Sequence, residues 1–176
     1  MAKYSKKKIN SYLTIGSSNA NTAIKGKAFE DLVCYLFEKI PGVEITQRNE
    51  MNTFQTEEID VAVWNDKKTN GLPFLPNIIL IECKNWSNPV SSIEVNWFCS
   101  KVESRGREFG ILIANNGITG NNEQLTAAHS IIARHLENKR EIIVITKTEI
   151  QAINDTKDLI KLIKTKLCHL AVSVKI

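Results

Sequence analysis

The chain has 176 residues, of which 43% are hydrophobic and 24% are charged, a usage that excludes a disordered or membrane-embedded protein. Its length favours a single domain with a substantial core, and its formal net charge of +4 adds a modest attraction to phosphates. Four lysines crowd the first eight residues, so we expect a basic N-terminal extension over residues 1–20 and one domain over residues 21–176.

The sequence shows no sign of membrane insertion or export. Its apolar runs are far shorter than the ~20 residues that cross a bilayer, and the N-terminus lacks the apolar segment of a signal peptide. The four cysteines occur singly and form no CxxC pair, which argues against a zinc site or a disulfide framework. We therefore expect a cytoplasmic protein with reduced cysteines and no membrane partner.

The first predicted element is an amphipathic helix from Thr22 to Ile40. Apolar residues recur there at three- and four-residue spacing, and Pro41-Gly42 ends the pattern. Three β-like runs follow, a weaker one over residues 43–48 and stronger ones over 59–64 and 78–83. We expect these three strands to form a meander.

The second half of the chain alternates helices and strands. The pattern predicts a helix over residues 93–107, a strand over 109–114, a helix over 121–136 with Asn121 and Gln124 at its cap, a strand over 141–146 and a helix over 155–170. This order predicts an α/β fold, a mixed sheet flanked by helices. Ligands of such sheets gather at the ends of strands.

Two of the predicted strands carry charged residues among apolar ones. Asp60 lies inside the run over residues 59–64, and Glu82 and Lys84 end the run that begins at Ile78. Because alternate side chains of a strand share a face, Glu82 and Lys84 point to the same side. Burial of such charges is unfavourable by several kcal/mol unless each has a partner, such as a metal ion or a phosphate.

These residues match the needs of phosphodiester hydrolysis. A cation neutralises charge at the scissile phosphate and lowers the pKa of a bound water, and carboxylate oxygens are the ligands that Mg²⁺ prefers. We therefore assign Asp60 and Glu82 as metal ligands. Lys84 is assigned to orient or deprotonate the water and to stabilise the growing negative charge.

The order of Glu30 in a helix, then Asp60, then Glu82-Cys83-Lys84 resembles the PD-(D/E)xK nuclease superfamily and, within it, the Mrr-type restriction endonuclease family. The similarity extends roughly over residues 25–146. The segments that carry it are Gly26-Lys27-Ala28-Phe29-Glu30, Glu58-Ile59-Asp60-Val61, Ile81-Glu82-Cys83-Lys84-Asn85-Trp86, and Gly110-Ile111-Leu112-Ile113 leading to Gly117-Ile118-Thr119.

The resemblance implies a restriction-endonuclease-like αβββαβ core and Mg²⁺-dependent cleavage of DNA that leaves 5′-phosphate ends, with Mn²⁺ expected to substitute. It implies work in defence against foreign DNA and a supporting role for Glu30. Ile59 stands where the superfamily has its namesake proline, and Glu82 stands where many Mrr-like proteins carry glutamine. A carboxylate favours tighter metal binding than an amide.

Partners follow from the same resemblance. Mrr-type enzymes often carry a separate DNA-reading domain, for which this chain has no room, so we expect a separate recognition or ATPase subunit. A homodimer is also expected, because cutting both strands requires two sites and symmetric pairing is the commonest way to supply them.

Several residues near the predicted site are candidates for DNA contact. Lys25 and Lys27 precede Glu30 and can reach the phosphate backbone. Asn85 and Trp86 follow Lys84 and can hydrogen-bond to or stack on nucleic acid, although a tryptophan is more often a packing residue. Two basic residues that end a predicted helix are further candidates for phosphate contact, Arg105 and Arg107.

Alternatives stay open at this stage. Glu58 shares the face of Asp60 at strand spacing and competes with it for the role of ligand. A structure-selective nuclease such as a Holliday-junction resolvase has a similar order of residues. A non-cleaving DNA-binding or assembly subunit with a nuclease fold is the alternative from another class.

Overall fold

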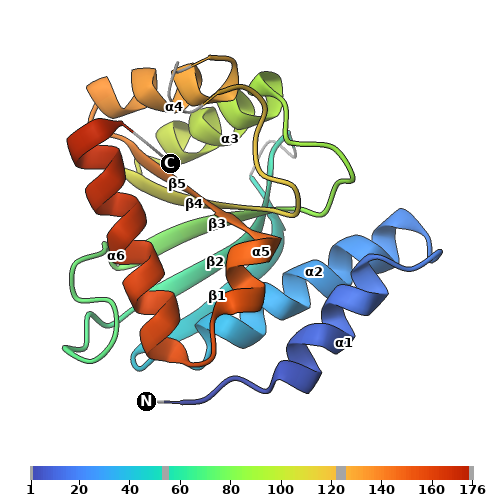
Figure 1. The fold of residues 1–176 in the computed structure, drawn as a ribbon. Coiled ribbons are helices and arrows are strands. Elements are labelled where there is room, and N and C mark those ends of the chain that lie inside the picture. The colour runs from blue at the N-terminus through green and yellow to red at the C-terminus, as the bar shows by residue number, and fades with distance from the viewer. Residues whose placement is uncertain (1, 53–55, 122–125, 175–176) are drawn as a thin grey trace.

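A computed structural model describes residues 2–52, 56–121 and 126–174. It has a five-stranded sheet between helices (Figure 1). The strands are β1 (Val43–Met51), β2 (Glu58–Asn65), β3 (Ile78–Lys84), β4 (Phe109–Ala114) and β5 (Glu141–Thr146). The helices are α1 (Lys6–Gly16), α2 (Thr22–Phe37), α3 (Ser92–Ser104), α4 (Ala128–Glu137), α5 (Lys147–Ala152) and α6 (Thr156–Ser173). The predicted α/β class is confirmed, and α2-β1-β2-β3-α3-β4 is the predicted αβββαβ order.

The sheet is mixed, with the strand order β1-β2-β3-β4-β5. β1, β2 and β3 pair antiparallel as the predicted meander, whereas β4 and β5 run parallel to β3. In the pairing of β2 with β3, Val61 lies opposite Ile81. The next residues outward along the two strands are Asp60 and Glu82, so the register brings these two carboxylates side by side.

Helices cover both faces of the sheet (Figure 1). α3 and α4 pack together on one face, and α2 and α6 lie on the other. All six residues of β4 are buried, as expected for a strand covered on both sides. α3 approaches β4 closely at Gly110, where an added Cβ would lie 2.8 Å from Val102 Cγ2 and 2.9 Å from Phe98 Cζ. A glycine at this position therefore lets α3 seat against the sheet.

The expected basic extension contains a packed helix. α1 buries Ile9 and Leu13, and Tyr4, just before it, donates a hydrogen bond from its hydroxyl to the Leu36 carbonyl at 2.8 Å. Lys6 Nζ donates to two carbonyl oxygens near α5, including that of Gln151 at 2.7 Å. One lysine of the charged run thus joins the N-terminal segment to the C-terminal part of the chain.

Two further differences concern the second half. The helix expected from Asn121 begins at Ala128, because Thr126 and Asn121 hydrogen-bond to each other and Ala127 adopts a positive φ of 49°. Gln124, expected at the cap, lies outside the described residues. The short helix α5 was not predicted; a capping box between Thr146 and Glu149 starts it. In the described ranges, none of the helices is long and apolar enough to cross a membrane.

Candidate active site

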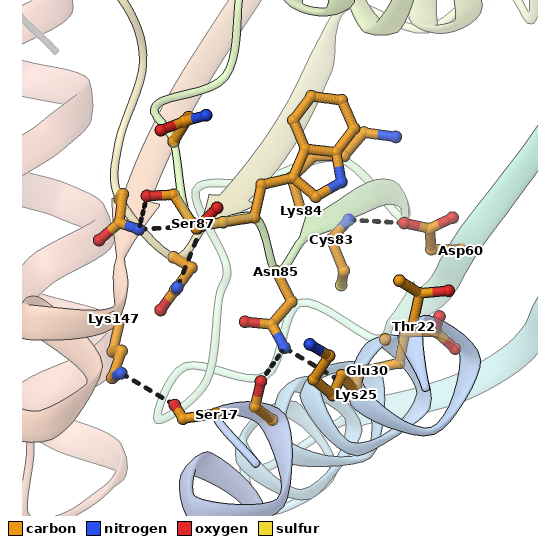
Figure 2. A pocket seen from close by; sticks show the side chains of 16 residues that line it. Ser17, Thr22, Lys25, Glu30, Asp60, Cys83, Lys84, Asn85, Ser87 and Lys147 are labelled. Atoms are coloured by element: carbon orange, nitrogen blue, oxygen red, sulfur yellow. Dashed lines mark hydrogen bonds between the residues drawn. The ribbon is translucent and has the colours of Figure 1, made fainter. Parts of the chain in front are cut away.

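Asp60 and the end of β3 are joined by a hydrogen bond. The Cys83 backbone N–H donates to Asp60 Oδ2 at 2.6 Å, as Figure 2 shows. This bond holds the carboxylate of Asp60 against the strand that carries Glu82 and Lys84. The three residues assigned from the sequence therefore lie together.

Glu82 is a buried carboxylate held by two lysines. Its side chain is only 2% exposed. Lys101 Nζ, from α3, lies 2.9 Å from Oε1 and 3.0 Å from Oε2, and Lys84 Nζ lies 2.9 Å from Oε1. Buried charges are stable in proteins only with such pairing. Glu82 is consequently tied to protein partners through both of its oxygens.

Lys84 contacts the buried Glu82 and also approaches more exposed residues of the site. Its Nζ also lies 3.8 Å from Glu94 Oε2 and 5.4 Å from the ring centroid of Trp86. Burial lowers the pKa of Lys84, but Glu82, Asp60 and Glu94 together outweigh burial, so the net pKa is raised. The ammonium of Lys84 is therefore charged at neutral pH.

The carboxyl group of Asp60 is electrostatically strained. Burial and the charge of Glu82 raise its pKa to about 7, against the lowering effect of the Cys83 N–H and of Lys84. Glu30 raises it further. A carboxylate that is costly to ionise is characteristic of functional sites, and a cation bound there would relieve the repulsion.

Glu30 reaches the site from α2. Its Oε2 accepts a hydrogen bond from Asn49 Nδ2 at 3.1 Å and lies 3.6 Å from Arg48 Nη2. Arg48 is more closely paired with Asp31, at 2.7 Å. Glu30 thus faces the same space as Asp60 while β1 fixes its position.

A cavity of about 790 Å³ opens over these groups (Figure 2). Asp60, Lys84 and Glu30 line it, whereas the buried Glu82 is not among the described residues that form the lining. Further polar side chains line the cavity: Ser17, Thr22, Lys25, Asn85, Ser87, Asn88, Asn115, Asn116 and Lys147. The cavity therefore combines carboxylates, ammonium groups and amides.

The residues predicted to contact DNA differ in their placement. Lys25 lines the cavity, whereas Lys27 is exposed on α2 outside the lining that the described residues form. Asn85 Nδ2 donates to the carbonyl oxygens of Gly16 and Lys25, so its amide N–H groups serve the fold. Trp86 is 42% exposed at the rim of the cavity, which leaves its ring available for stacking.

Three other charged residues named from the sequence lie outside the cavity lining. Arg105 pairs with Glu57 at 2.7 Å and, with Arg107, lines a separate cavity over the sheet. Glu58 is exposed at the start of β2.

Sequence reasoning missed Lys101 and several lining residues. Lys101 follows Phe98 by three positions, which places a charge on the apolar stripe of α3. This position was the available sign that Lys101 is buried. Ser17 and Lys147 are 130 residues apart in sequence, yet Lys147 Nζ lies 3.4 Å from Ser17 Oγ, and no local pattern predicts such a contact.

The residues fit a divalent cation at Asp60. In the described part of the chain no three His, Cys, Asp or Glu side chains converge on one point, but Mg²⁺ keeps several waters and binds through one or two carboxylates plus substrate phosphates. Asp60 supplies a partly buried carboxylate that lines the cavity and is repelled by the charge of Glu82. Glu82 is adjacent, and its oxygens are shared with Lys84 and Lys101.

Comparison with known proteins identifies the family. A comparison with curated proteins found no match. The family model Mrr_cat, described as restriction endonuclease, matches residues 22–153, which is more than half of the chain. The match includes every residue assigned to the site from the sequence. The chain therefore belongs to the Mrr_cat restriction endonuclease family.

Proposed function

We propose that this nuclease of the restriction-endonuclease type hydrolyses DNA phosphodiester bonds with the help of Mg²⁺, for which Mn²⁺ substitutes. The observation that carries the proposal is the pairing of Asp60, whose pKa is raised to about 7, with the charged Lys84 in one cavity. Repelling carboxylates favour a cation, and a nearby ammonium favours a phosphate.

Each residue receives a role from its position. Asp60 is the main ligand for the cation and Glu82 is the second. When bound, Mg²⁺ neutralises charge on the scissile phosphate and lowers the pKa of a water molecule. Lys84 is protonated, so it orients the water and stabilises the negative charge of the transition state, and it does not remove the proton. Glu30 supports Asp60 from α2.

Other residues of the cavity suit DNA. Lys25 attracts the phosphate backbone, and the exposed ring of Trp86 offers a surface for stacking. We propose a homodimer, since two sites are needed to cut both strands. Restriction or defence in the cytoplasm, with a separate recognition or ATPase subunit, is the role that fits the family.

The roles of Asp60 and Lys84 are tested by cleavage of supercoiled plasmid in Mg²⁺. We expect Asp60→Ala and Lys84→Ala each to reduce the cleavage rate by at least about 10²-fold. Circular dichroism checks that the variants stay folded. Glu58→Ala is the matched control, because Glu58 lies on the same strand at an exposed position. Undiminished cleavage by a folded Asp60→Ala protein, or loss of cleavage in Glu58→Ala, would contradict the assignment.

A further inference from the structure

Lys101 is a buried ammonium next to the cavity. Its side chain is 5% exposed, and its Nζ contacts both carboxylate oxygens of Glu82. Lysine is almost never buried without a paired charge. α3 is held against β4 by the close approach at Gly110, so the position of this ammonium is fixed by the core of the fold.

Two ammonium groups contact the single carboxylate of Glu82. Lys84 already lies 2.9 Å from Glu82 Oε1, and one ammonium neutralises one carboxylate. Lys101, which is not among the described residues that line the cavity, adds a second positive charge beside Glu82. A divalent cation that takes Glu82 as a ligand must therefore compete with Lys101 for oxygens that are already hydrogen-bonded.

Resting on the proposed metal-dependent function, we propose that Lys101 is a positioning residue that acts through Glu82 and weakens the affinity of the DNA-free site for divalent cations. Lys101 holds the Glu82 carboxylate beside Asp60 and neutralises part of its negative charge. Phosphate oxygens of bound DNA then supply the ligands that the protein alone lacks. The enzyme thereby holds its metal firmly only when DNA is present.

The sign of the effect distinguishes this role from simple support of the fold. Removal of the Lys101 charge eliminates repulsion between a cation and an ammonium in a buried setting, so Mn²⁺ should bind on the order of tenfold more tightly. A residue that merely supports the fold would, when replaced, loosen the site and weaken binding. Lys101→Arg keeps the charge and should preserve the weaker affinity.

The test is isothermal titration of Mn²⁺ into DNA-free protein. The variants are Lys101→Met and, because a methionine could impair folding beside Glu82, Lys101→Gln, which keeps a hydrogen-bond donor without charge. We expect about tenfold tighter Mn²⁺ binding in both and wild-type affinity in Lys101→Arg. In a Glu82→Gln background, Lys101→Met should increase the Mn²⁺ affinity much less, because Lys101 acts through the Glu82 carboxylate.

Unchanged or weaker Mn²⁺ binding in a folded Lys101→Met or Lys101→Gln protein would overturn this role while leaving the metal site at Asp60 intact. Failure of the proposed function gives a different result. If neither wild-type protein nor the folded Lys101→Met and Lys101→Gln variants bind Mn²⁺, or if Asp60→Ala binds it as well as wild type, the metal site itself is wrong, and the role of Lys101 is overturned with it.

Discussion

At the scale of single residues, Asp60 is held in a state that opposes its own ionisation. Its pKa is raised from 3.8 to about 7, first by burial and then by the charge of Glu82. A group whose pKa is raised by folding costs the protein stability as the pH rises towards the folded-state value. The folded protein with ionised Asp60 is therefore less stable than it would be with a neutral side chain at this position, a common trade-off at active sites.

The variant Asp60→Asn tests whether the raised pKa of Asp60 lowers the stability of the folded protein. Asparagine keeps an acceptor for the Cys83 N–H but does not ionise. The contribution of Asp60 to wild-type stability falls as the pH rises from about 4 to about 7, because Asp60 ionises in the unfolded chain there while folded Asp60 resists ionisation, and the loss levels off above that range. In metal-free buffer, the advantage of Asp60→Asn in free energy of unfolding should therefore grow from pH ~4 to pH ~8. Urea denaturation measures it.

A constant difference between Asp60→Asn and wild type across that range would show that the raised pKa of Asp60 is wrong. Added Mg²⁺ provides the complementary check at the higher pH. A ligand that binds only the folded state stabilises it, so Mg²⁺ should raise the stability of wild type more than that of Asp60→Asn.

At the scale of secondary structure, the packing of α3 on β4 determines where Lys101 lies. Gly110→Ala should lower the free energy of unfolding by about 1–3 kcal/mol, because the new methyl group overlaps Val102 and Phe98 in a packed core. Gly26→Ala is the matched control. Gly26 lies within α2, and apart from its chain neighbours and the nearby backbone of that helix nothing lies within 4 Å of the added Cβ, so alanine there should stabilise by roughly 0.5–1 kcal/mol.

The two alanine variants are compared by urea denaturation under identical conditions. Equal stability of Gly110→Ala and wild type would mean that α3 is not seated tightly on β4. In that case Lys101 would also lack the fixed position that its contact with Glu82 requires.

At the scale of the whole molecule, α1 is part of the folded unit although it precedes the family match. Ile9 is fully buried, whereas Ile15 on the same helix is 40% exposed. Ile9→Ala should reduce the free energy of unfolding by about 2–4 kcal/mol, and Ile15→Ala by much less. Unfolding followed by both fluorescence and circular dichroism should show one transition. Equal, small effects of the two substitutions would indicate that α1 is detached from the core.

Much of this architecture was predictable from the sequence, for identifiable reasons. β4 and β5 were predicted at their observed bounds, since buried strands give continuous apolar runs, and the neighbouring segments resembled a known family. α1 was missed because it buries only Ile9 and Leu13, and its many lysines resemble a solvated tail. Lys101 was missed because its partner Glu82 lies on another element. Burial of a charge depends on such contacts between distant segments, which local patterns do not show.

The measurement that tests the central proposal most directly is plasmid cleavage by wild-type protein in EDTA, followed by excess Mg²⁺. Supercoiled, linear and four-way DNA are compared in parallel, with Lys84→Ala as the inactive reference. We predict no cleavage in EDTA, recovery of cleavage on addition of Mg²⁺, and no recovery in Lys84→Ala. Cleavage that persists in EDTA would contradict the metal-dependent site, and stable binding of DNA without cleavage in any divalent cation would contradict its assignment as a nuclease centre.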